Sequence, residues 1–167
     1  MGQFASLFRR SAWRLETLDL YDSPQTRERM ARFAAGEPID PRPREHWLAM
    51  LRDGRVMGRT VGRVHILGPL NDYLRYEIAC YEQNVAAGED IRLMSRAHGA
   101  TLGLPEFDFW LLDDETVAVM KYGERGVFIG AEFVTDPQFA AQCQRWRDIA
   151  TSNAVPLSEY QAGRTAA

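Results

Sequence analysis

Six polar or aromatic side chains in predicted strands are the residues of this sequence best suited to binding chemistry. Successive side chains of a strand point to opposite faces of a sheet, and each predicted strand has one apolar face. If the apolar faces coincide, the opposite face collects Arg63, His65, Arg92, Asp108, Trp110 and Glu132. Guanidinium groups bind carboxylate or phosphate through a planar fork, and an indole offers a stacking surface. This face therefore predicts a site for a small anionic ligand.

Two structural alternatives to a ligand site stay open for this face. An antiparallel sheet can simply present one solvated polar face. Residues 1–60 can instead pack over the face, which would make structural ion pairs of Arg63, Arg92, Asp108 and Glu132. A ligand site is compatible with such a cover, in a cleft between the N-terminal helices and the sheet.

A predicted helix adds Tyr73, Arg75 and Glu77 as candidates at the end of this cleft. Tyr73 and Glu77 lie, with Cys80 and Asn84, on a second stripe with helical spacing beside the apolar one. Such a stripe is also typical of the boundary between a buried and an exposed helix face. Arg75 lies on the opposite flank. There it could pair with Asp72, point into solvent or reach a more distant partner.

Signatures of catalysis and of metal binding are absent from the sequence. It contains no phosphate-binding glycine loop, no dinucleotide-binding glycine pattern and no serine elbow of the hydrolases. His46, His65 and His98 are far apart, and neither His-x3-His nor Cys-x2-Cys occurs. The acidic runs at 89–90 and 113–115 have the composition of turns. We therefore expect no metal and no cofactor.

Composition and charge argue against two further classes. The 167 residues carry a net charge of −3, so direct nucleic-acid binding is not expected, although the first sixty residues are rich in arginine. No apolar run approaches the roughly 18 residues of a membrane span, and the first residues lack the pattern of a signal peptide. The two cysteines have no spacing typical of a disulfide scaffold or a zinc site. These features predict a protein of the reducing cytoplasm.

The elements that position the candidate residues follow from the hydrophobic pattern. It predicts strands over residues 60–67, 91–95, 107–112, 116–122 and 126–134. An amphipathic helix with apolar residues at 70, 74, 78, 81 and 85 connects the first two strands, which makes them a parallel βαβ unit. Short turn-prone connections make the last three strands an antiparallel meander. A long helix follows Pro137, and residues 13–18 alternate partly, as a strand would.

The predicted fold is α+β: a mixed five-stranded sheet, with one parallel βαβ unit and an antiparallel meander, packed by two long helices. We expect a mainly helical N-terminal region at 1–59, the mixed-sheet core at 60–160 and a disordered tail at 161–167.

Four stretches resemble an actinobacterial family of uncharacterised proteins, a domain of unknown function. They are RLETLDLY, GPLNDYLRYEIACYEQNVAAGEDIRLM, LPEFDFWLLDD and WRDIATSNAVPLSEY. The resemblance extends from about residue 4 to 160 and implies a cytoplasmic bacterial protein without an assigned reaction. Members of this family are often encoded near helix-turn-helix regulators, which implies a regulatory role and such a regulator as partner.

The order of elements from residue 60 also looks like half of a phospholipase-D-type fold. Those enzymes use His-x-Lys-x4-Asp, in which the histidine attacks phosphorus and the lysine binds phosphate. None of the three histidines has a lysine two residues later, and the single lysine, Lys121, follows Val119 at that spacing. The resemblance therefore implies no phospholipase chemistry.

The sequence thus favours a cytoplasmic, non-enzymatic regulatory or protein-interaction protein whose partner is another protein, such as a helix-turn-helix regulator. The alternative is a sensor of a small anionic ligand, or an enzyme, that uses a polar cleft between the sheet and the N-terminal helices. The identity of the ligand or partner and the oligomeric state are left open.

Overall fold

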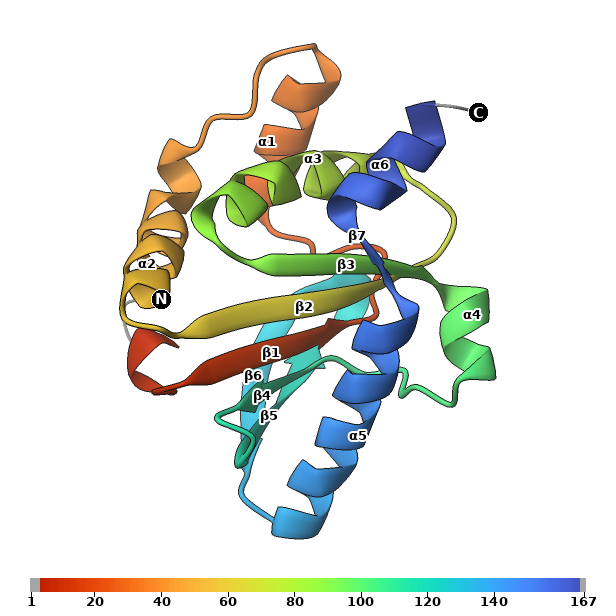
Figure 1. The fold of residues 1–167 in the computed structure, drawn as a ribbon. Coiled ribbons are helices and arrows are strands. Elements are labelled where there is room, and N and C mark those ends of the chain that lie inside the picture. Colours follow the sequence, from red (N-terminus) through yellow and green to blue (C-terminus); the bar gives the residue numbers. More distant parts are fainter. Residues whose placement is uncertain (1–3, 166–167) are drawn as a thin grey trace.

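A seven-stranded mixed sheet organises residues 4–165, the part of the chain that the computed structural model describes (Figure 1). The strand order is β6-β5-β4-β1-β2-β3-β7. The strands are β1 (Ser11–Glu16), β2 (Thr60–Leu67), β3 (Asp90–Ser95), β4 (Phe109–Leu112), β5 (Thr116–Tyr122), β6 (Phe128–Val134) and β7 (Val155–Pro156). β1, β2 and β3 are parallel, and the four other strands pair antiparallel.

The α+β class and the mixed sheet are confirmed, but the predicted number of five strands is wrong. β1 lies in the middle of the sheet, between β4 and β2. Its residues Ala12, Leu15 and Glu16 are buried on both faces of the sheet, so the strand has only a partial alternation of polar and apolar residues. β7 has two residues, too few to produce a periodic pattern. β4 and β6 each begin two residues later than predicted.

The described residues contain six α-helices. They are α1 (Pro24–Ala34), α2 (Glu45–Val56), α3 (Asp72–Ala87), α4 (Arg96–Thr101), α5 (Pro137–Asn153) and α6 (Leu157–Thr165). Side-chain oxygens of Ser23, Asn71, Ser95 and Asp136 accept backbone N–H groups at the starts of α1, α3, α4 and α5.

One face of the sheet packs against α5 and is called the α5 face. Cys143 and Ala150 of this helix share an apolar core with Leu15 of β1 and Val64 of β2. The opposite face, called the α3 face, packs against α2 and α3. There Leu51 of α2 contacts the core around Val61, and Leu74 and Tyr81 of α3 join a core with Leu93.

The buried face of α3 differs from the apolar stripe that its sequence predicts. Val85 of that stripe is 42% exposed, whereas Tyr73, Cys80 and Asn84 of the neighbouring polar stripe are buried. The reason is that α3 packs on the sheet and also against α1 and α2, so helices cover its flank as well (Figure 1). A polar side chain on this flank must then find its hydrogen bonds inside the protein.

The hairpin between β4 and β5 confirms that residues 113–115 form a turn. Asp113 and Asp114 have φ values of 52° and 65°, the left-handed conformation that tight hairpins require. The Asp113 carboxylate also accepts the backbone N–H groups of Arg9, Arg10 and Ser11 at 2.6–2.9 Å. The turn therefore holds the beginning of β1.

Part of the C-terminal tail that was expected to be disordered is helical. Residues 161–165 belong to α6, while residues 166–167 of that tail lie outside the described residues.

Within residues 4–165 every helix is too short or too polar to cross a bilayer.

Candidate functional site

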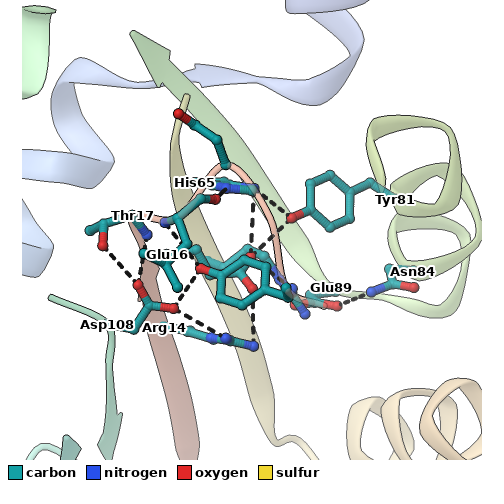
Figure 2. Close-up of polar contacts among 12 residues, drawn as sticks. Arg14, Glu16, Thr17, His65, Tyr81, Asn84, Glu89 and Asp108 are labelled. Carbon is teal, nitrogen blue, oxygen red and sulfur yellow. Dashed lines mark hydrogen bonds and ion pairs between the residues drawn. The ribbon is translucent and has the colours of Figure 1, made fainter. Parts of the chain in front are cut away.

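A cluster of buried polar side chains lies on the α3 face, between the sheet and α3 (Figure 2). We call it the polar network. Its members are Arg14, Glu16, Arg63, His65, Tyr81, Asn84, Glu89 and Asp108. The strand register brings the central members together, because Arg14 is level with Arg63 and Glu16 is level with His65 across the parallel β1–β2 pair. Side chains in register point to the same face.

Glu16, at the end of β1, lies at the centre of the polar network. Its side chain is 3% exposed, and its carboxylate accepts three donors. These are Arg14 Nη1 at 3.0 Å, Arg63 Nη1 at 3.0 Å and the Tyr81 hydroxyl at 2.9 Å. Burial alone would raise the pKa of Glu16, but Arg14 and Arg63 lower it well below its usual value. Glu16 is therefore ionised inside the protein.

A second carboxylate, Glu89, joins the strands to the helices above them. It is fully buried and accepts Arg63 Nε at 2.6 Å. Asn84 of α3 donates to it at 2.7 Å, and Trp47 of α2 donates at 3.4 Å. Asn84 in turn accepts Arg44 Nη2 at 2.7 Å. Glu89 does lie in the turn between α3 and β3, as its composition predicts, but its side chain is 2% exposed and turned into the polar network.

A third carboxylate, Asp108, fastens the chain that follows β1. It accepts the Thr17 backbone N–H at 2.8 Å, the Thr17 hydroxyl at 2.9 Å and the Tyr21 hydroxyl at 2.5 Å. Arg14 Nη2 lies 3.3 Å from it. Burial and the nearby carboxylates of Glu16 and Asp108 raise the pKa of Tyr21 well above its ordinary value. Tyr21 therefore stays a hydroxyl that donates to Asp108.

One hydrogen bond of His65 determines where a ring hydrogen lies. Its Nε2 is 2.9 Å from the carbonyl oxygen of Leu18, which only accepts, so Nε2 carries a hydrogen. Its Nδ1 is 2.8 Å from the Tyr81 hydroxyl, which also lies 2.9 Å from the Glu16 carboxylate. The Tyr81 hydroxyl therefore links His65 to Glu16.

The ion pairs of the polar network join two arginines to three carboxylates. The arginines are Arg14 and Arg63, and the carboxylates are Glu16, Glu89 and Asp108. Buried charges are tolerated when each has a partner of opposite sign and its hydrogen bonds are satisfied.

Four of the predicted site residues come together on the α3 face: Arg63, His65, Asp108 and Trp110. Trp110 is also buried, and the Arg14 guanidinium lies 5.5 Å from its ring centre. Tyr73 packs edge-on to Tyr21 beside this group. Glu77 is half-buried on α3, and its charge contributes to the raised pKa of Tyr73 after the larger effect of burial. Arg75 is exposed.

The expected common face is wrong for Arg92 and Glu132, which lie on the α5 face. Arg92 is level with Val64 of the α5 core and donates to the Thr151 carbonyl of α5 at 3.4 Å. Glu132 pairs with Lys121 at 3.1 Å near the edge of the sheet. The error has a physical cause: helices cover both faces of the sheet, so the apolar sides of neighbouring strands need not coincide.

The predictions missed Arg14, Glu16, Tyr81 and Glu89. A signal for two of them exists, because Arg14 and Glu16 share one side of β1 with the buried Ala12. Tyr81 was assigned to the apolar stripe, and its hydroxyl gives no pattern in the sequence.

The polar network uses its charges internally. Two hollows of the surface are lined mainly by other groups. One lies among residues around Phe33 and Tyr76, and the other among residues around Arg55 and Arg59 with Glu89 of the polar network. Among residues 4–165 no group of three or more His, Cys, Asp or Glu side chains is arranged to hold a metal ion. Ligand binding by the predicted residues therefore stays a prediction, and these residues do not all share the sheet face on which that prediction depended.

Comparison with known proteins gives a family and no activity. A family model described as a domain of unknown function (DUF6879) matches residues 1–162. No curated protein matches the chain.

Replacement of Glu16 tests the balance of the polar network. Glu16→Gln leaves Arg14 and Arg63 undercompensated, so we expect the free energy of unfolding at pH 7 to fall by about 3–5 kcal/mol. The matched control is Glu115→Gln, for which loss of the exposed pair with Arg10 should lower the free energy of unfolding by less than about 1 kcal/mol.

The effect of Glu16→Gln should depend on pH. Because the folded-state pKa of Glu16 is lowered, its contribution to the free energy of unfolding is present above its unfolded pKa of about 4.3 and is lost as pH falls from there through the folded-state pKa. Urea unfolding at pH 7 and pH 3 should show the loss shrinking at low pH. Equal losses for both variants would contradict the central role of Glu16.

Nuclear magnetic resonance tests the hydrogen assignment of His65. We expect Nε2 of His65 to give the ¹⁵N shift of a ring nitrogen that carries hydrogen, because it donates to the Leu18 carbonyl. Tyr81→Phe removes the hydroxyl beside Nδ1 and should change the Nδ1 shift, while Tyr76→Phe, on the same helix and with its ring against Phe33, is the control. An Nε2 without hydrogen would contradict the assignment.

Proposed function

The chain belongs to the family described as a domain of unknown function (DUF6879), and we propose that it works as a protein-interaction protein whose docking surface is the free edge of its sheet, β6. Its partner on this proposal is an extended segment of another polypeptide, which adds a strand to the sheet. Strand addition of this kind uses main-chain hydrogen bonds for affinity and side-chain contacts for specificity.

The observation that carries the proposal is the exposed apolar character of this edge. Val127, Phe128, Ile129 and Phe133 are 43%, 55%, 69% and 54% exposed. They lie on or next to a strand that carries one charged residue, Glu132, and no proline. Proteins usually blunt such edges with charges, prolines or very short strands, because an unpaired apolar edge recruits other strands. Contiguous exposed apolar groups mark interaction sites.

The opposite edge of the sheet shows the protection that β6 lacks. β7 has two residues, and one of them is Pro156, which has no N–H to donate. α6 follows β7 directly and packs Leu157 into the core beside Leu93 (Figure 1). Within the described residues, β6 is thus the edge with both length and apolar surface.

The internal pairing of the polar network supports the same interpretation. Arg63 and Asp108, two groups suited to binding an anion or acting on a substrate, have protein partners for their charges. The outer edge of β6, by contrast, pairs with no other strand within the described residues.

A regulatory role, a helix-turn-helix regulator as partner and a cytoplasmic location are parts of this proposal. The regulator is the partner that the family resemblance implies. The cytoplasm suits the two cysteines, which are free and buried. Burial raises the pKa of Cys143 to about 11, which keeps it a thiol.

Affinity capture from an extract of the native host tests the docking surface. The three baits are the wild type, Phe133→Lys on β6 and the matched control Val56→Lys on α2, where Val56 is 88% exposed. Both substitutions place a lysine at an exposed apolar position, so we expect each to change the free energy of unfolding by less than about 1 kcal/mol. A specific partner should bind the wild type and Val56→Lys alike and Phe133→Lys at least about tenfold less, as quantified by mass spectrometry. Recovery of the same proteins by all three baits would overturn the proposal.

A further inference from the structure

We propose that the segment that docks on β6 is the β6 strand of a second copy of this chain, so that two sheets join antiparallel across a two-fold axis near Ala131. This inference rests on the proposed function of β6 as a docking edge, and it names a second copy, in place of the regulator, as the occupant of that edge. The two-fold axis runs perpendicular to the sheet, and each copy offers the same surface to the other.

The strand is complementary to itself in one register. When two copies of β6 pair antiparallel in one continuous sheet, residues directly opposite each other point to the same face. The two-fold axis must therefore pass through a residue and not between two residues. A centre at Glu132 places two carboxylates directly opposite each other, which is unfavourable. A centre at Ala131 places Glu132 of each copy opposite Gly130 of the other. The charges therefore disfavour the centre at Glu132 and are compatible with the centre at Ala131.

Gly130 makes this register favourable for a second reason. On its other side Gly130 is level with Lys121 of β5, and Lys121 lies on the same face as Glu132. Since glycine has no side chain, nothing stands on that face between Lys121 and Glu132 of the second copy. Each Lys121 would then lie between two carboxylates, its own at 3.1 Å and that of the second copy. The joined edge carries two positive and two negative charges.

The α3 face supplies the apolar part of the contact. Ala131 and Phe133 are level with Met120 and Ala118, which belong to this face. In the register centred on Ala131, Phe133 lies across from Ile129 of the second copy. These two residues are 54% and 69% exposed in a single chain, so pairing would cover the most exposed part of the edge.

An irregularity in β6 limits the length of the pairing. The register with β5 shifts between Lys121 and Tyr122, which leaves Ile129 as an extra residue before Gly130. The segment in regular register with β5 is therefore residues 130–134. A contact centred on Ala131 pairs residues 130–132 of this segment between the two copies, whereas Phe133 pairs with the extra residue Ile129. This short regular pairing predicts a reversible dimer.

Sedimentation of the purified protein tests the dimer. We expect a concentration-dependent dimer for the wild type and for Val56→Lys, and a dissociation constant at least about tenfold higher for Phe133→Lys. Glu132→Lys places lysines on both sides of Gly130 and should weaken the dimer by a similar factor. The double variant Lys121→Glu with Glu132→Lys exchanges the charges and should restore it. A dimer that none of these substitutions weakens would overturn the proposed interface.

Cysteine crosslinking tests the register. Ala131→Cys brings two thiols face to face on the two-fold axis, so a mild oxidant should link the copies. Phe133→Cys is the control: its thiols would lie four residues apart along the strands, about 13 Å, too far for a disulfide. The native Cys80 and Cys143 are 1% and 0% exposed and do not compete. Faster crosslinking at position 133 than at position 131 would overturn the register.

The failure of this inference differs from failure of the proposed function. A wild type that stays monomeric up to about 100 µM overturns the second copy as occupant. The capture experiment with Phe133→Lys then decides by itself whether β6 binds a different protein.

Discussion

The contacts of the buried Glu16 carboxylate hold β1, β2 and α3 together. A charge that is 3% exposed destabilises a fold unless cations and donors surround it, and Arg14, Arg63 and Tyr81 do so here. These partners come from β1, β2 and α3, which are far apart in sequence. A slip of one residue between β1 and β2 would turn Glu16 and Arg63 to opposite faces. The carboxylate therefore selects both the strand register and the position of α3 over the sheet (Figure 2).

The same constraint explains the unusual distribution of groups in the molecule. The charged side chains of the polar network point inward and are paired, while β6 at one edge of the sheet is apolar and exposed. α2 and α3 lie over the polar network and α5 packs on the other face, while most residues of β6 are exposed. A protein of this kind is suited to recognition by strand pairing, with the polar network as the rigid support of the sheet.

Much of the fold was predictable because local patterns determine it. The helix caps, the parallel β2–β3 pair and the aspartate turn before β5 all have clear signals in the sequence. The site was predictable only in part. Side-chain alternation correctly grouped Arg63 with His65, because they lie on one strand. It failed for Arg92, because alternation gives parity within a strand and cannot tell which side faces which helix. Glu89 was missed because an acidic residue after a glycine has the composition of a turn, and only the buried Arg63 explains its position.

Pairing of β6 with another polypeptide should protect its backbone amides. Amide hydrogen exchange at low and high protein concentration can measure this protection, with peptides from residues 128–134 compared with peptides from α2. We expect exchange in β6 to slow as the concentration rises, while exchange in α2 around Val56 is unchanged. Exchange in β6 that is fast at every concentration, and equally fast in the presence of captured host proteins, would contradict this pairing.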